Sequence, residues 1–587
     1  MAKKRSHATT TVEMIVRQIL PKGSLPPPVR SRSDKWAVCP EWAPDLFAVT
    51  ATLVEATGCF IQSRQVGGSR SSHRSYLKDI AAAAKAWDKS FRQPAEVQKW
   101  WTVVWASRKS LLAQVSSDAD WVGALLRLLA TSDEVCAGIG WSSTKRRSTS
   151  VAKRASLAFF QIAADADDSE LSGFLPYSPH SLCVLVPPDV AIVLPKAITA
   201  AVGCSVRSAS HHLSLLPGRL TMLPTWHLGA NGNQGNQLRL LIVPFPFYVP
   251  ATSFKKGAPD DTLPDANGKY QGFFRLTPDW LNGITPEMFV DELLIPLLRA
   301  AHSENGEDIH GLIFPECAFS RTFSDQLAST LASRTTGQTL RVRFMVAGVM
   351  EEEGGVARNK ALCYTFDDAD VQKSVAANRQ SVALGSHSKH HPWCLDVAQI
   401  RRYGLSNLFH GDRARWWEQI DVSQRRLPFF AIRDDLCMTV LICEDLARSD
   451  PAMPVVRSVG PNLVIALLMD GPQLAARWPG RYATVLADDP GSSVLSITCA
   501  GMMDRSNANQ KNPVRAIGLW RHANGDMQEL ILPPMASGLL LYLQSVDEEQ
   551  HTLDGRADGY RTSRLELQYT APLSLLGARP AWLLPAT

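Results

Sequence analysis

A cysteine stands where a buried strand is expected to end, and it is the strongest candidate nucleophile in the chain. The apolar run from Met438 to Ile442 predicts a strand of the protein core. Cys443 comes next, and the carboxylates Glu444 and Asp445 follow it. A thiol at the end of a core strand is held rigidly and can face a pocket at the rim of a sheet. The strand alone more often indicates a buried cysteine that packs as a small hydrophobic side chain.

Two residues upstream have the types and the settings that such a thiol needs. The predicted strand at residues 311–314 is followed by Pro315-Glu316, which places a carboxylate at the rim of a buried strand. Lys389 comes later, in a polar segment that also holds histidines. Each has a simpler explanation by itself, because a turn glutamate is often salt-bridged and a loop lysine is often solvated. With Cys443 they supply a base, a cation and a thiol.

Taken together, these residues resemble the Glu–Lys–Cys set of the nitrilase, or carbon–nitrogen hydrolase, superfamily. The segments that carry the resemblance are 312–316, 388–391 and 441–445, with agreeing flanks at 358–361 and 461–501. The resemblance covers residues 237–545, about half of the chain. It implies a nitrilase-like four-layer α-β-β-α sandwich, activity on a small-molecule amide or nitrile, and homo-oligomers. It also implies that the catalytic residues are Glu316, Lys389 and Cys443.

The chemistry of that set explains why its members belong together. A thiol with an ordinary pKa of about 8.5 is a poor nucleophile at neutral pH unless a base or a cation assists it. Glu316 would take the thiol proton and later pass it to the leaving amine. Lys389 would stabilise the negative oxygen of the tetrahedral intermediate, with the backbone N–H of Glu444 as a second donor. Water would then release the acyl group from Cys443, with no cofactor and no metal.

The chain departs from the family's pattern between the lysine and the cysteine. That interval is long for the family, and residues 404–426 look like an insertion near the mouth of the pocket. The family's second glutamate has no clean match, and Glu418 is the candidate for it. Arg413 and Arg415 in the insertion suggest an anionic group on the substrate, although solvated surface arginines explain them as well.

The histidines around Lys389 invite a metal site. His387, His390 and His391 lie within five positions of one another, but no acidic or thiol ligand flanks them closely. The sequence therefore predicts no metal there.

Composition places the chain among ordinary globular proteins. It has 587 residues, which suggests several domains, with 45% hydrophobic and 20% charged residues. The net charge of +5 permits an acidic partner without requiring one. The 11 cysteines are odd in number and form no CxxC pair, which fits a reducing cytoplasm better than a disulfide framework. No secretory signal or membrane span is expected, so a cytoplasmic location is predicted.

The rest of the chain is divided by composition. Residues 1–35 predict a flexible basic arm, 36–228 a mainly helical N-terminal domain, 229–236 a linker, 237–545 an α/β domain and 546–587 a C-terminal extension. Apolar spacing predicts helices at 11–20, 45–58, 79–91, 97–112 and 118–132, and short strands at 182–186 and 190–194. The tryptophans of the helical domain are expected in its core rather than on a base-stacking surface.

Three functions are compatible with these patterns. The first is an amidase or nitrilase. Segments 39–49 and 193–203 loosely resemble regions fused to nitrilase-like domains in bacterial phage-defence proteins, which suggests a role in antiviral defence. The second is a catalytically degenerate sensor or assembly module acting with a partner such as a reverse transcriptase. The third is an acyltransferase. A nucleic acid or a defence protein could bind the basic N-terminal half.

Overall fold

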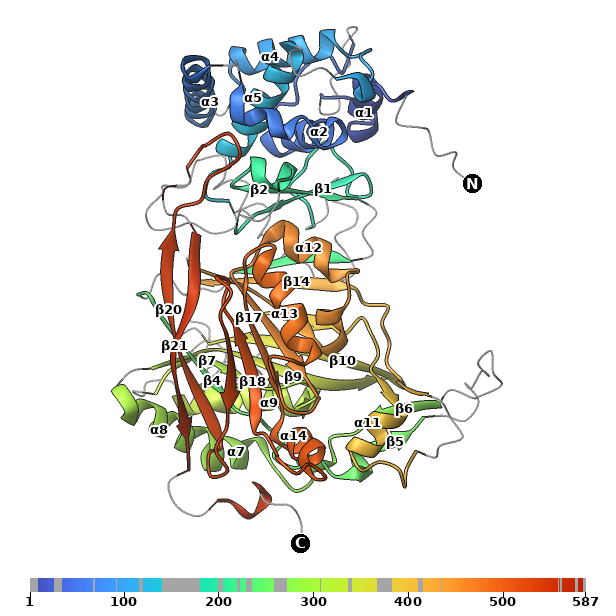
Figure 1. The fold of residues 1–587 in the computed structure, drawn as a ribbon, viewed down its shortest axis with the longest axis vertical. Helices are drawn as coiled ribbons and strands as arrows, with labels where there is room; N and C mark the ends of the chain where they lie inside the picture. Colours follow the sequence, from blue (N-terminus) through green and yellow to red (C-terminus); the bar gives the residue numbers. More distant parts are fainter. Residues whose placement is uncertain are drawn as a thin grey trace.

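The computed structural model describes most of the chain. The described residues are 9–25, 34–66, 69–90, 92–115, 120–139, 180–198, 204–218, 222–228, 235–257, 272–306, 308–335, 340–366, 383–409, 415–433, 435–557, 559, 562–575 and 579–583. Figure 1 shows a helical region at one end, a two-stranded sheet beneath it, and a larger α/β body that holds the remaining elements.

Helices form the N-terminal region, as the apolar spacing predicts. They are α1 (Val12–Ile19), α2 (Ala43–Thr57), α3 (Arg70–Ser90), α4 (Ala95–Ala106) and α5 (Asp120–Glu134). In α2, Pro44 lies in the first turn, and the helix ends at Gly58, whose φ of 68° suits glycine. Trp101 and Trp105 of α4 are buried, so these tryptophans belong to the core.

A small sheet joins the helical region to the α/β body. It pairs β1 (Ala191–Pro195) with β2 (Leu213–Pro217), which confirms the second of the two short predicted strands. The first, at residues 182–186, is wrong because this segment bends around a buried carboxylate. One oxygen of Asp45 accepts the backbone N–H groups of residues 184, 185 and 186, which are therefore unavailable for a sheet.

Two large sheets make up the α/β body. The eight-stranded sheet contains β4 (Gln237–Ile242), β7 (Ile309–Ile313), β8 (Phe319–Ser320), β9 (Val342–Glu353), β10 (Val356–Thr365), β11 (Gly385–Ser388), β20 (Gly538–Glu548) and β21 (Thr562–Leu573). The seven-stranded sheet contains β3 (Leu223–Leu228), β14 (Arg426–Arg433), β15 (Leu436–Ile442), β16 (Leu463–Leu468), β17 (Ser493–Thr498), β18 (Ala516–Arg521) and β19 (Met527–Ile531). The strands β15, β16 and β17 run parallel, so their carboxyl ends share one edge.

The alternation of side chains along β4 shows how the layers pack. Leu240 joins a core that contains strands of both sheets, whereas its neighbour Leu241 joins a second core with Leu297 and Leu327. Those two leucines belong to α8 (Ile295–Asn305) and α9 (Arg321–Thr335), which cover the outer face of the eight-stranded sheet together with α7 (Pro286–Phe289).

Helices α12 (Ala452–Val459) and α13 (Trp478–Asp488) cover the other sheet (Figure 1). The predicted fold class, a four-layer α-β-β-α sandwich preceded by a mainly helical N-terminal domain, is confirmed. None of the helices in the described part of the chain has the length and apolar character needed to cross a membrane.

Two elements of the sandwich lie outside the range 237–545. Strand β3 pairs with β14 although it precedes the expected linker, most of which lies outside the described residues. Strand β21 pairs with β20 although it lies in the expected C-terminal extension. The sandwich is therefore built from a longer stretch of chain than the resemblance covers.

A third, small sheet contains part of the insertion. Its strands are β5 (Phe254–Lys256), β6 (Gly272–Leu276), β12 (Cys394–Asp396) and β13 (Arg415–Glu418). Strand β13 comes from the insertion and pairs with β6 in parallel and with β12 antiparallel. The insertion is thus anchored to the body at the end of β13, where Glu418 stands.

Candidate active site

Cys443 lies at the turn that ends β15. This strand is buried along its whole length between β14 and β16, and a short 3₁₀ turn, Cys443–Ala447, follows it. Cys443 has a φ of 45°, a backbone conformation that costs energy for a residue with a side chain. Such strain is often found at functional positions. The side chain is buried, with 4% of the residue exposed.

Glu316 follows β7, and its backbone is fixed by a glycine of the neighbouring strand. A Cβ at Gly348 of β9 would lie 2.3 Å from the Pro315 carbonyl oxygen and 2.5 Å from the Glu316 Cα. Only a glycine at position 348 therefore lets β9 pass this close to the backbone of Pro315 and Glu316. Cys317, the next residue, has a φ of 56°, so the chain turns sharply after Glu316. The carboxylate is buried.

Lys389 follows β11 and is completely buried. Its ammonium group donates to Glu316 Oε1 at 2.8 Å and to Glu418 Oε2 at 2.6 Å. Its backbone N–H donates to the Asn359 carbonyl oxygen at 2.8 Å, which fixes the segment after β11 against β10. A buried ammonium is stable only when it is paired in this way.

Glu418 completes the polar cluster around Lys389. Asn359 of β10 donates through one side-chain nitrogen to Glu316 Oε1 at 2.8 Å and to Glu418 Oε1 at 2.9 Å. The backbone N–H of Trp393 donates to Glu418 Oε2 at 2.9 Å. The side-chain nitrogen of Asn359 carries two N–H groups and can donate one to each carboxylate. Asn359 and Lys389 therefore both link the two glutamates.

The charges of this cluster act on each other in the buried interior of the protein. Burial raises the pKa of Glu316; Lys389 opposes that rise and Glu418 adds to it. Burial works against the charged form of Lys389, but Glu316 and Glu418 together hold its pKa well above the ordinary value. Burial, followed by the charge of Glu316, raises the pKa of Cys443 well above its ordinary value, and Lys389 opposes this. The resting thiol is therefore protonated, and its reaction needs a base.

The structure thus brings four of the five predicted site residues together. Glu316, Lys389 and Glu418 are linked by hydrogen bonds, and the first two act electrostatically on Cys443. The side chain of Glu444 instead lies 3.9 Å from an arginine four residues later, so its expected contribution remains that of a backbone donor.

Sequence reasoning gave no role to Asn359 or Trp393. An asparagine inside a buried strand is the signal that could have identified the first, because a buried amide requires partners. The contact through the Trp393 backbone leaves no such signal. Of the two insertion arginines, Arg415 is exposed and Arg413 lies outside the described residues.

Comparison with known proteins gives structural relatives only. No protein-family model and no curated protein matches the sequence. The solved structure of Nit3 from Saccharomyces cerevisiae, a nitrilase-superfamily member, covers 51% of this chain and 89% of its own, with 11% identity and a TM-score of 0.31. XC1258 from Xanthomonas campestris, a CN-hydrolase-superfamily protein, covers 45% and 76%, with 14% identity and a TM-score of 0.23.

The NitFhit protein of C. elegans covers 50% of this chain and 57% of its own, with 10% identity and a TM-score of 0.26. The structural relatives are nitrilase-superfamily proteins. At this level of similarity, the chemistry of the chain has to be argued from its own side chains.

Proposed function

We propose that this chain is a carbon–nitrogen hydrolase of the amidase or nitrilase type, acting in the cytoplasm with Cys443 as its nucleophile. The observation that carries the proposal is the buried ammonium of Lys389 between two carboxylates beside a strained cysteine. A structural ion pair needs one carboxylate for one ammonium. A second carboxylate, and a thiol whose reaction needs a base, are what acyl transfer from an amide requires.

The reaction follows from these positions for an amide substrate. The sulfur of Cys443 attacks the carbonyl carbon while its proton passes to Glu316. Lys389 stabilises the negative oxygen, with the backbone N–H of Glu444 as the second donor. The carbon–nitrogen bond then breaks, and Glu316 returns the proton to the nitrogen, which leaves as ammonia. Water attacks the thioester, Glu316 takes its proton, and the acid leaves as the thiol is restored.

The raised pKa of Glu316 suits both halves of this cycle. A carboxyl group titrating closer to neutral pH than usual accepts a proton and returns it with less bias. Glu418 supports it in two ways: its charge helps to raise this pKa, and it accepts a hydrogen bond from Lys389. Glu418 is therefore the second glutamate in this proposal.

Ammonia release tests the hydrolase directly. The full chain is incubated with panels of aliphatic and aromatic amides and nitriles, and ammonia is measured against the Cys443→Ala variant. The proposal expects release from at least one substrate class that the variant abolishes. Release that persists in Cys443→Ala contradicts it, and so does a full panel without release when Cys443 is also inert to thiol reagents.

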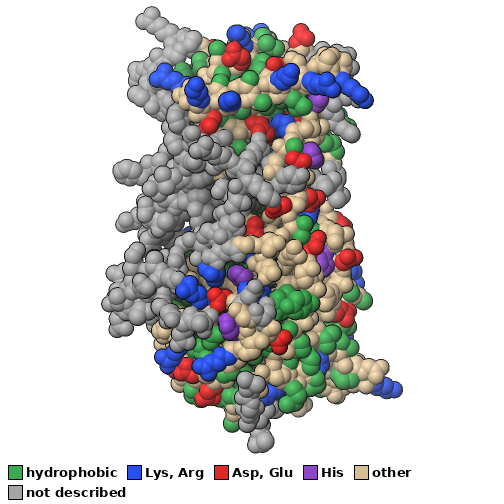
Figure 2. Space-filling model, turned by 90° about the vertical axis from the view of Figure 1, so that its left-hand side faces the viewer, with side chains coloured by type: hydrophobic (Ala, Val, Ile, Leu, Met, Phe, Trp, Pro, Cys, Tyr) green, Lys and Arg blue, Asp and Glu red, His purple; other side chains and the backbone are tan. Residues whose placement is uncertain are grey.

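The degenerate sensor or assembly module is the second candidate, and two observations favour it. Glu316, Lys389 and Cys443 are all nearly inaccessible in the isolated chain. Helix α3 also carries exposed basic residues along its length, namely Arg70, Arg74, Lys78, Lys85 and Lys89. In Figure 2, blue side chains gather across the helical end. This candidate predicts salt-sensitive binding of short single-stranded RNA or DNA that Lys78→Glu with Lys85→Glu weakens.

A further inference from the structure

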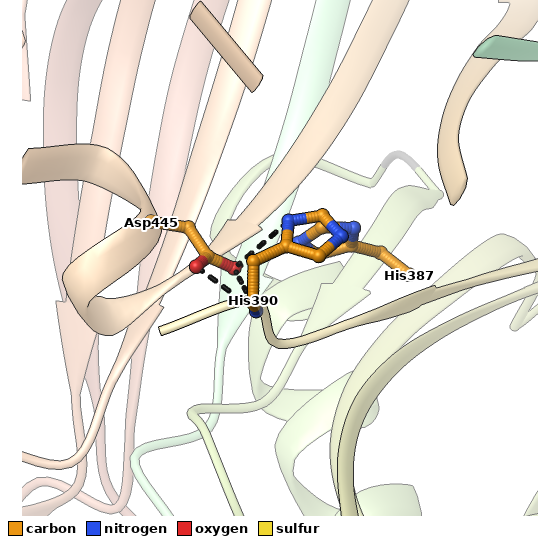
Figure 3. Close-up of side chains that lie close together, drawn as sticks. All are labelled: His387, His390 and Asp445. Atoms are coloured by element: carbon orange, nitrogen blue, oxygen red, sulfur yellow. Dashed lines mark hydrogen bonds and ion pairs between the residues drawn. The ribbon is translucent and has the colours of Figure 1, made fainter. Parts of the chain in front are cut away.

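A second cluster lies immediately behind the catalytic residues. His387 of β11 and His390, one residue after Lys389, meet Asp445 of the turn that begins with Cys443 (Figure 3). One ligand-type atom from each of these three side chains lies within 4.8 Å of the others, and all three residues are buried. The acidic ligand that the sequence around the histidines lacks is thus supplied by a segment more than fifty residues later.

His387 is held between two hydrogen-bond acceptors. Its Nδ1 lies 3.0 Å from the Arg426 carbonyl oxygen, and its Nε2 lies 3.0 Å from Asp445 Oδ2. A neutral imidazole has only one N–H, so it cannot donate to both oxygens. The arrangement requires either a proton on each nitrogen or a cation in place of the Nε2 proton. A histidine that donates through Nδ1 to a backbone carbonyl and presents Nε2 is the usual arrangement of a metal ligand.

His390 has a buried ring whose nitrogens make no hydrogen bond. Neither Nδ1 nor Nε2 has a hydrogen-bond partner in the described structure, and Nδ1 lies 3.9 Å from Asp445 Oδ2. The rings of His387 and His390 pack edge to face, with their centroids 4.7 Å apart.

Two other clusters in the described residues have comparable spacing, but a cation from the chain already occupies each. Asp133 and Glu134, near His212, both accept from the Arg556 guanidinium, at 3.1 and 2.9 Å. The Glu316, Cys317 and Glu418 cluster contains the ammonium of Lys389.

Asp445 differs from both of those clusters. Within the described part of the chain, its ion-pair contacts are all with histidines, and its other hydrogen bonds come from the backbone N–H groups of His390 and His391.

We propose that His387, His390 and Asp445 bind a divalent transition metal of the Zn²⁺ type, with His391 as the fourth ligand. Imidazole nitrogens with a carboxylate oxygen suit such an ion, at bond lengths of about 2.0–2.2 Å. His391 Nδ1 already lies 2.8 Å from Asp445 Oδ1, and its side chain is the partly exposed one, which provides an entry route.

The metal would have a structural role. Lys389 lies between the ligands His387 and His390 in the chain, and Cys443 lies two residues before the ligand Asp445. An ion bound here fixes the lysine segment to the nucleophile turn. Four protein ligands leave no open position for substrate, as in structural sites. This inference does not depend on the hydrolase activity, because it concerns only how two segments are held together.

Cobalt titration of the full chain tests the site without any substrate. The chain is treated with a chelator, and Co²⁺ alone is added while the visible absorption of tetrahedral Co²⁺ and the melting temperature are recorded. The proposal expects saturation at one ion per chain, a higher melting temperature, and displacement of the signal by Zn²⁺. His390→Asn should abolish the signal, and His391→Ala should weaken binding at least tenfold while leaving the fold intact.

The matched control is His212→Asn, which changes a histidine of one of the other clusters and should leave the Co²⁺ signal unchanged. Three outcomes overturn the proposal: no tetrahedral signal from the wild-type chain, a signal that survives in both His390→Asn and His391→Ala, or a signal lost only in His212→Asn. Should His390→Asn not fold, as judged by circular dichroism, His391→Ala decides the matter alone.

Discussion

At the scale of single residues, the site depends on one ammonium group that holds two carboxylates. Lys389 donates to Glu316 and Glu418, and Asn359 donates to the same two glutamates. Burial raises the pKa of Glu316, Lys389 opposes this rise, and the charge of Glu418 offsets part of the effect of Lys389. The second glutamate therefore helps to keep the pKa of the proposed base above its ordinary value.

Glu418→Gln tests that arrangement through pH. Removing a negative charge lowers the pKa of Glu316, so the base becomes available at lower pH. The acidic limb of the rate of Cys443 alkylation should move down by about one pH unit. Stability should fall by about 1–3 kcal/mol, because the amide cannot accept all the hydrogen bonds of the carboxylate.

The control for this prediction is Glu351→Gln. Glu351 is a carboxylate of β9 that pairs with Lys360 at 2.5 Å rather than with Lys389. Its variant should leave the acidic limb in place. An acidic limb that stays fixed in Glu418→Gln, or that moves equally in both variants, would contradict the assigned role of Glu418.

At the scale of elements, the site is assembled by strand ends and by one close approach of two backbones. β11 and β15 end directly before Lys389 and Cys443, β7 ends three residues before Glu316, and β13 brings Glu418 from the insertion. The turn after β7 depends on Gly348, which lies against the Glu316 backbone. The position of the proposed base therefore depends on a residue without a side chain, whose backbone N–H donates to the Pro315 carbonyl oxygen at 3.2 Å.

Gly348→Ala should move Glu316 without removing any functional group. The added methyl must displace backbone atoms rather than a flexible side chain, so we expect a loss of about 2–4 kcal/mol in unfolding free energy. Cys443 alkylation should slow at least tenfold. Gly354→Asn is the control, because this turn glycine has free space around it and a φ of 59° that asparagine tolerates. Equal losses in the two variants would contradict the close-contact account.

Sequence reasoning identified strands better than it identified the contacts among them. The strand that leads to Cys443 was predictable because continuous apolar residues indicate a buried strand. Glu418 had only weak support, because its place depends on β13 pairing with β6 across more than a hundred residues. Asp445 was seen as a turn carboxylate, yet it meets the histidines only because β11 and the turn after β15 fold together. Such long-range contacts leave no local pattern in a single sequence.

At the scale of the whole molecule, a loop of the sandwich holds the helical region in place. The connection between β20 and β21 reaches up to α5, as Figure 1 shows at the helical end. There Arg556 is buried and pairs with Asp133, Glu134 and Asp554. Tyr76 of α3 donates to Asp554 at 3.0 Å. The two halves are therefore joined by a buried charged network as well as by apolar packing.

Arg556→Ala should loosen the attachment of the helical region. Three carboxylates would lose their shared buried cation, and breaking such a network typically costs about 3–5 kcal/mol. Denaturant unfolding should show this loss, and limited proteolysis should cut the helical region first. Arg334→Ala, which removes an exposed partner of Asp291, should unfold like the wild type. Indistinguishable unfolding of the two variants would contradict a stabilising role for the network.

The most direct test of the central claim is the rate at which each of the 11 cysteines reacts with iodoacetamide near neutral pH, mapped by peptide mass spectrometry. Cys204, which is exposed, and Cys437, which is buried in the strand that leads to Cys443, serve as references. We predict that Cys443 reacts fastest, and that Glu316→Gln slows it by about 10²–10⁴-fold and Lys389→Ala slows it sharply, in folded protein. A Cys443 that reacts no faster than Cys437 and is indifferent to both substitutions would contradict the claim.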